Sequence, residues 1–169
     1  ETNAKELRAH YTVILQAMMR QAPKWRDLEW LRSQTNLPVL LKGVSHPDDA
    51  RRTLDVGLQG VVVSNHGGRG LDRVPASLTL LPAIRAALGN DATVLLDGGI
   101  RSGADVFTSL ALGADAVLIG RPQIHALAIA GALGVAHMLK LLRNELELTM
   151  ALTGCAGIEE ITASSLFRP

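Results

Sequence analysis

Hydrophobic and polar positions follow two different patterns along the chain, and the change falls near Pro38. Up to residue 36, apolar side chains recur at helical spacing, which predicts helices over about 7–19 and 27–35. From Pro38 onward, short apolar runs alternate with amphipathic segments, a pattern typical of a parallel sheet buried on both faces. We therefore divide the chain into a helical lead-in, 1–36, and an α/β domain, 37–169.

Four apolar runs are predicted strands, and amphipathic segments between them are predicted helices. The strands are Val39–Lys42, Gly60–Asn65, Thr93–Asp97 and Ala116–Gly120, and the helices fall at about 47–56, 77–88 and 103–112. A long helical region follows Gly120. Its apolar stripe, which we expect to close against the sheet or a partner, consists of Leu139, Leu142, Leu146, Met150 and Leu152.

A weak internal repeat indicates the kind of α/β fold. Residues 38–43 (PVLLKG) resemble residues 93–98 (TVLLDG), and residues 57–63 resemble residues 113–119, so two βαβ units of similar length follow each other. This doubling favours a (β/α)8 TIM barrel, with a flat doubly wound sheet as the alternative. Because four strands cannot close a barrel of about eight, we expect the C-terminal half of a barrel that an absent N-terminal half completes.

Composition and charge mainly exclude certain kinds of partner and site. The chain has 17 Lys+Arg against 16 Asp+Glu and no basic stripe, so we do not expect nucleic acid as a partner. Cys155 is the one cysteine, and no histidine has metal-ligand spacing, so neither an internal disulfide nor a metal site is expected. No apolar run suggests a transmembrane segment and the N-terminus does not resemble a signal peptide, which favours a cytoplasmic protein. Because the chain begins without methionine, we expect more chain before it.

Two glycine-rich segments follow the last two predicted strands, where the working groups of a parallel barrel gather. The segment from Asp97 through Gly98, Gly99 and Ile100 to Arg101 offers flexible backbone, a helix N-terminus with free N–H groups, and a guanidinium, all suited to a phosphate. Gly120 and Arg121 follow the next strand. Two such loops favour phosphate binding, and the alternative is a pair of tight turns with surface arginines.

The loop Ser64-Asn65-His66-Gly67-Gly68-Arg69 carries the sharpest candidate chemistry. It places an imidazole and a guanidinium three residues apart at the end of a strand. Histidine titrates near neutral pH, so His66 can accept a proton, and Arg69 can hold a carboxylate through two parallel hydrogen bonds. The pair suits a small acid that loses a proton next to its carboxylate. A purely structural loop histidine is the alternative.

Lys42 ends a buried apolar strand, where an ammonium without a partner would be costly. Two kinds of partner are open. One is the N1 and O2 edge of a flavin, where positive charge favours hydride acceptance. The other is a loop carboxylate such as Asp72 or Asp97.

Taken in order, four segments together resemble the FMN-dependent L-2-hydroxy acid oxidase/dehydrogenase family, which includes glycolate oxidase, lactate oxidase, L-lactate dehydrogenase and mandelate dehydrogenase. The segments are Leu40–Val44, Ser64–Arg69, Asp97–Arg101 and Gly120–Pro122. The likeness runs from about Trp25 to about Ile161, and its order and spacing are highly specific. Gly70 replaces a frequent glutamine, and His125 lies where the family usually has Tyr-Gly.

The resemblance implies oxidation of an L-2-hydroxy acid, with His66 as the base and FMN as the acceptor of a hydride or its carbanion-route equivalent. It further implies that Arg69 binds the substrate carboxylate and that Lys42 and Ser64 contact the flavin. The FMN phosphate would be held by Asp97, Gly98, Gly99, Arg101, Gly120 and Arg121.

The resemblance also implies partners. The N-terminal half of the same protein would supply the carboxylate that partners the catalytic histidine, and the family forms homo-oligomers, often tetramers. In some relatives the loop just before Glu1 carries a membrane-binding segment, so peripheral membrane association stays open. Two alternatives remain. One is another FMN barrel, such as an isopentenyl diphosphate isomerase or an IMP-dehydrogenase-like enzyme, and the other is a non-catalytic phosphate-binding half-barrel.

Overall fold

A computed structural model describes residues 2–167, with the side chains of residues 11–167. The chain forms two compact units that divide between Leu37 and Pro38, one residue beyond the boundary expected from the sequence. The first unit contains helices α1 (Thr2–Gln21) and α2 (Trp25–Ser33). Helix α2 is capped at its start, where the Asp27 carboxylate accepts a hydrogen bond from the Lys24 amide at 2.6 Å.

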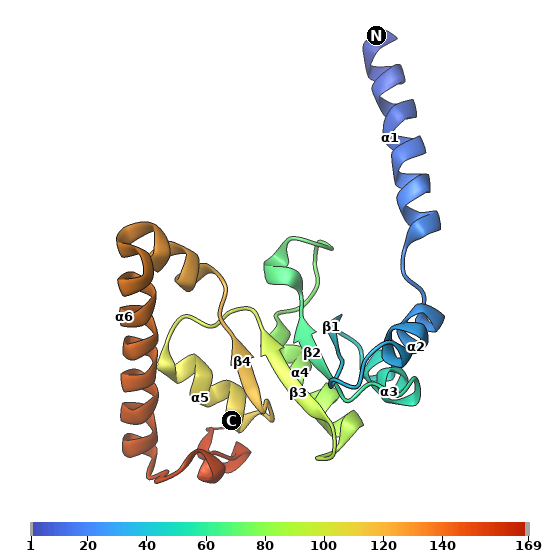
Figure 1. Cartoon of the computed structure of the whole chain (residues 1–169). Coiled ribbons are helices and arrows are strands. Elements are labelled where there is room, and N and C mark those ends of the chain that lie inside the picture. Colours follow the sequence, from blue (N-terminus) through green and yellow to red (C-terminus); the bar gives the residue numbers. More distant parts are fainter. Residues whose placement is uncertain (1, 168–169) are drawn as a thin grey trace. The chain divides into compact units, whose positions relative to one another are not determined.

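The second unit contains every strand and helix predicted for residues 37–169, with ends that shift by at most two residues (Figure 1). Short 3-10 turns, η1 to η3, follow β2 and α6. In chain order the elements are β1 (Leu40–Val44), α3 (Pro47–Asp55), β2 (Gly60–Ser64), η1 (His66–Gly68), α4 (Ser77–Leu88), β3 (Thr93–Asp97), α5 (Gly103–Ala111), β4 (Ala116–Leu118), α6 (Arg121–Thr153), η2 (Ile158–Glu160) and η3 (Ala163–Ser165).

The strands form one parallel sheet in the order β1-β2-β3-β4, with a helix in each connection. A doubly wound sheet reverses its strand order at a switch point. The four described strands show no reversal, so this alternative is excluded for the part of the chain that the structure describes. Strands that follow each other in one direction through right-handed crossovers build a curling sheet, as expected for part of a barrel.

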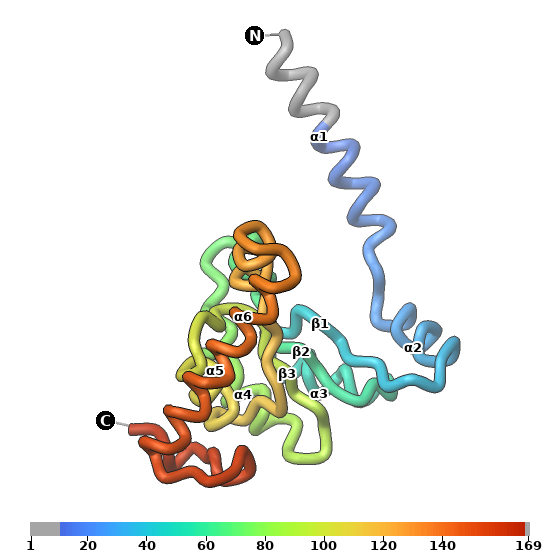
Figure 2. Tube along the Cα trace, turned by 60° about the vertical axis from the view of Figure 1, so that its left-hand side comes forward, coloured from blue at the N-terminus to red at the C-terminus, as the bar shows by residue number. Residues whose placement is uncertain are grey.

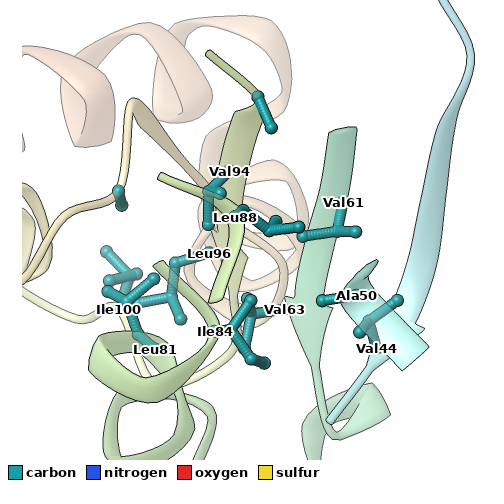
Figure 3. Close-up of a cluster of buried hydrophobic side chains, with 12 residues drawn as sticks. Val44, Ala50, Val61, Val63, Leu81, Ile84, Leu88, Val94, Leu96 and Ile100 are labelled. Carbon is teal, nitrogen blue, oxygen red and sulfur yellow. The ribbon is translucent and has the colours of Figure 1, made fainter. Parts of the chain in front are cut away.

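The core lies between the sheet and its helices. Val61 and Val63 on β2 and Val94 and Leu96 on β3 are fully buried, and they pack with α4 side chains such as Ile84 (Figure 3). Alternate residues of a strand point to opposite faces of the sheet. The polar residues that end these strands, Ser64 and Asp97, therefore face away from the helices.

Helix α6 runs beside α5, and non-helical torsions at Ala130 and Gly131 break it (Figure 2). Beyond the break only part of the predicted apolar stripe is covered. Leu142 is buried, and Leu146 and Met150 pack on the cluster around Phe107 of α5, whereas Leu139 and Leu152 remain exposed.

Length and composition alone would let α6 cross a membrane. This helix is the one among the described residues that passes that test, which core helices of water-soluble proteins also pass. The break at Ala130 and Gly131 interrupts this helix. The expectation that no segment spans a membrane therefore stays a prediction.

Candidate functional site

The carboxyl ends of β1, β2 and β3 bring together an ammonium, a hydroxyl and a carboxylate. Lys42 Nζ donates to Asp97 Oδ2 at 2.7 Å and to Ser64 Oγ at 3.1 Å. Ser64 Oγ in turn donates to Asp97 Oδ2 at 2.5 Å. Ser64 and Asp97 are direct register partners in the β2–β3 ladder, so the sheet itself places them side by side.

The charge of Asp97 is stabilised by this arrangement. Partial burial alone would raise the pKa of the Asp97 carboxyl. Hydrogen bonds from Lys42 and Ser64, with the positive charge of Lys42, outweigh burial and hold the pKa below its ordinary value. Asp97 is therefore an anion that offsets the charge of Lys42.

The structure distinguishes the roles open to Lys42 and Ser64. Of the two carboxylates considered for Lys42, Asp97 forms the ion pair, while 43% of the lysine side chain remains exposed toward the cavity described below. Ser64 is only 1% exposed, and its hydroxyl is hydrogen-bonded to Lys42, Asp97 and the His66 amide. It lies beneath the site, and its contact with a flavin stays a prediction.

The histidine loop is shaped by two residues that the sequence reading did not single out as functional. The side-chain oxygen Oδ1 of Asn65 accepts a hydrogen bond from the backbone amide of Gly67 at 3.1 Å. The backbone amide of Asn65 donates to Ser77 Oγ at 3.1 Å. The His66 amide donates to Ser64 Oγ at 3.0 Å, while His66 itself adopts a left-handed φ of 55°. The Asx turn was detectable from Asn65 before a glycine pair. The buried Ser77 lies twelve residues away and gave no local signal.

One cavity of about 870 Å³ collects the predicted site residues from four strand ends. Ser64 alone among them lies outside its lining, directly beneath Lys42 and Asp97. Leu118, Ile124 and His125 also line the cavity and were not predicted. The predicted residues in its lining are Lys42, His66, Arg69, Asp97, Gly98, Gly99, Arg101, Gly120 and Arg121.

The helix N-terminus expected to bind an anion at α5 is already occupied. The amides of Arg101 and Ser102 both donate to Asp105 Oδ2 at 2.8 Å, and the Gly103 amide donates to Glu145 Oε2 at 2.8 Å. The expectation of free N–H groups there is wrong. Ser102 followed three residues later by Asp105 is a capping box, and this signal was present in the sequence.

The N-terminus of α6 receives no side-chain cap, although Pro122 has no N–H group and the Gln123 amide donates to the Gly120 carbonyl oxygen at 3.1 Å. Its N-cap is Gly120, which offers no capping side chain, and its first turn contains no acidic residue. A Cβ added at Gly99 or Gly120 would meet no atom within 4 Å, so both backbones face open space. An uncapped helix start beside the guanidinium groups of Arg101 and Arg121 suits an anion such as phosphate.

A hydrogen bond links the N-terminus of α6 to the loop that carries His66. Arg121 Nη2 donates to the Gly67 carbonyl oxygen at 2.5 Å, so the first residue of α6 holds the loop that follows β2. A Cβ at Gly67 would lie 3.2 Å from the same nitrogen. Glycine at this position lets the guanidinium approach closely. Among the described residues, no group of three or more His, Cys, Asp or Glu side chains could hold a metal ion.

Sequence comparison relates the chain to a known family. The profile described as FMN-dependent dehydrogenase matches residues 1–168. An L-lactate oxidase of Alicycliphilus denitrificans is 59% identical over 153 residues, which are 90% of this chain and 42% of that protein. A peroxisomal (S)-2-hydroxyacid oxidase of Arabidopsis thaliana, GLO3, is 52% identical over 82% of this chain and 38% of its own length.

Structural comparison agrees. A crystal structure of mandelate oxidase with 3,3-difluoro-2-hydroxy-3-phenylpropionic acid superposes with a TM-score of 0.81 at 48% identity. The match covers 83% of this chain and 43% of that one. The four-stranded sheet is thus part of a (β/α)8 barrel, and the chain spans about two fifths of the length of the relatives it matches.

Proposed function

The chain belongs to the FMN-dependent dehydrogenase family, and from this premise we propose that it forms one wall of an active site that oxidises an L-2-hydroxy acid to the 2-oxo acid. One observation carries the proposal. A single cavity brings His66 and Arg69 together with Lys42 and an uncapped, arginine-lined helix N-terminus. A proton acceptor, a carboxylate clamp and an anion cradle are the groups that this reaction needs.

The residues of the cavity fit FMN. The open backbones of Gly99 and Gly120 and the guanidinium groups of Arg101 and Arg121 would hold the phosphate. Gly98 lines the same end. The exposed part of Lys42 would lie against the electron-rich edge of the isoalloxazine ring. When bound, FMN supplies the acceptor for the two electrons that leave the substrate.

In this proposal Asp97 positions Lys42, whereas the family resemblance implied that it binds the phosphate. A carboxylate that directly faces a phosphate would be repelled, whereas Asp97 is paired with Lys42. We assign it to holding the Lys42 ammonium in place, and through Ser64 Oγ it also holds the backbone amide of His66. A direct phosphate contact by Asp97 stays a prediction.

The substrate is oriented by Arg69 and deprotonated by His66. The guanidinium holds the carboxylate in a fixed plane through two parallel hydrogen bonds. The imidazole of His66, on the same loop, takes a proton from the substrate as C2 gives up its electrons. The hydrogen bonds of Ser64 and Asn65 hold the backbone of the loop that carries both side chains.

The rest of the protein supplies the remaining wall. We propose that the part outside this chain closes the barrel and provides the carboxylate partner of His66. The whole protein is proposed to be a cytoplasmic homo-oligomer. Size-exclusion chromatography with light scattering checks the oligomeric state, and cell fractionation checks the location.

The test uses the full-length protein with His66 replaced by alanine. Wild type should show flavin absorbance and oxidise L-lactate, glycolate or mandelate. The variant should keep the flavin and lose about 10²- to 10⁴-fold in kcat, the contribution of a positioned base. The matched control is His137→Gln, an exposed histidine of α6, which should behave as wild type.

Two outcomes would defeat the proposal. A wild-type protein that binds phosphate without any flavin absorbance would support the non-catalytic alternative. Unchanged turnover in His66→Ala would remove His66 from the reaction.

A further inference from the structure

Gly43 lies where strand β1 meets the imidazole of His66. A Cβ built on Gly43 would lie 2.6 Å from His66 Cε1 and 3.3 Å from Nε2. Separations below 3.0 Å essentially never occur for a real Cβ, so the ring is packed on bare backbone. The contact joins the proposed base to a neighbouring strand rather than to its own loop.

The backbone at Gly43 is also irregular. Lys42 pairs with Val62 and Val44 pairs with Val63, so β1 contains one extra residue at Gly43, a β-bulge. Because of the bulge, Lys42 faces the cavity and Val44 faces the helix-side core, where it is 4% exposed. In a regular strand these two residues would lie on the same face.

We propose that Gly43 is a positioning residue for the proposed reaction, and that its missing side chain provides the seat that fixes the His66 imidazole. The inference rests on the proposed role of His66 as base. A side chain at residue 43 would displace the ring by about 0.8 Å to reach ordinary van der Waals separation. A base displaced by that distance loses its alignment with the substrate proton.

A second role of glycine must be separated from this one. Gly43 has φ +94°, where any side chain is strained whether or not it meets a neighbour. Gly57, after α3, has φ +84°, yet a Cβ there would meet nothing within 4 Å. Gly57→Ala therefore carries a similar backbone strain without the contact to His66, and it is the matched control.

The experiment compares Gly43→Ala and Gly57→Ala in the full-length, FMN-loaded enzyme. For Gly43→Ala we expect a crystal structure with a displaced His66 ring, kcat lower by about 10- to 100-fold and KM within about threefold of wild type, because Arg69 is untouched. Gly57→Ala should keep the wild-type kcat and ring position. An unmoved ring in Gly43→Ala, or an equal displacement of the ring in both variants, would overturn the proposal.

Two further outcomes are covered by the design. If Gly43→Ala does not fold, adding His66→Ala should restore soluble, flavin-loaded protein, because the clashing ring is gone. Failure of that rescue counts against the seat. A ring that moves without any change in kcat would retain the seat but refute His66 as the base, which separates the failure of this inference from that of the proposed function.

Discussion

The ammonium of Lys42 and the carboxylate of Asp97 lie 2.7 Å apart and join the ends of β1 and β3 across the intervening strand β2. The hydroxyl of Ser64, at the end of β2, bonds to both. Three neighbouring strands are thus tied together at the edge that carries the site. The pair connects the stability of the sheet with the position of the cation offered to the cofactor.

Replacing Asp97 with asparagine should destabilise the full-length protein by about 1 kcal/mol at neutral pH, a value reduced because Lys42 is 43% exposed. The folded pKa of Asp97 is depressed, so its contribution is complete above the ordinary value of 3.8 and disappears as the pH falls through the lower folded value. Urea unfolding of wild type and variant at about pH 7 and at acid pH measures this. Asp91→Asn, at an exposed loop residue, is the control. A difference that stays constant with pH would contradict the assignment.

Replacing Arg69 with lysine should raise KM for the 2-hydroxy acid by about 10- to 100-fold and leave flavin binding intact. Lysine keeps the positive charge but loses the planar fork that holds both carboxylate oxygens. Steady-state kinetics measures the effect. Arg73→Lys, on the same loop, serves as the control for the chemical change. Equal KM values in the two variants would show that Arg69 does not bind the carboxylate.

Replacing Arg121 with lysine should weaken FMN binding by about tenfold or more. The variant loses bidentate contact with the phosphate and the bond from Nη2 to the Gly67 carbonyl oxygen. Titration of the apoprotein with FMN, followed by quenching of flavin fluorescence, gives the Kd. Arg143→Lys lies on an exposed face of the same helix and should bind as wild type. The cradle at α6 would be refuted by an unchanged Kd in Arg121→Lys.

Replacing Gly60 with alanine should lower the free energy of unfolding by about 2–3 kcal/mol. A Cβ at Gly60 would overlap the Thr93 carbonyl oxygen, and Thr93 is its register partner on β3. The obstacle is backbone, which cannot rotate away as a side chain does. Urea unfolding measures the loss, with Gly70→Ala, in open surroundings, as the control. Similar stabilities for both variants would show that the β2–β3 spacing has more room than described.

The local pattern was enough to predict the strands and helices of the second unit. Period-two burial and buried apolar runs depend only on nearest neighbours in the chain, and β3 begins and ends where the sequence predicted. The strand ends β1 and β4 were misplaced by about two residues. At β1 the reason is the bulge at Gly43, which extends the strand to Val44 and depends on the pairing with β2.

The sequence was enough to predict which residues form the candidate site, but not which of them pair through hydrogen bonds. Parallel strands place their carboxyl ends at one edge of the sheet. His66, Arg69, Lys42 and the glycine loops could therefore be expected to lie close together. Which groups pair there depends on side-chain distances. Of the two carboxylates expected as partners of Lys42, only the distances single out Asp97, and Asp105 with Glu145 bonds to the helix N-terminus that was expected to be free.

The sequence by itself determined the order of strands and helices, the family motifs and the identity of the groups that could do chemistry, because these follow from spacing along one chain. The tertiary structure alone decided that Lys42 is paired with Asp97, that Ser64 lies beneath the site and that His66 rests on Gly43. Those relations join residues more than twenty positions apart. They arise only when the sheet sets its register, and no local pattern contains that register.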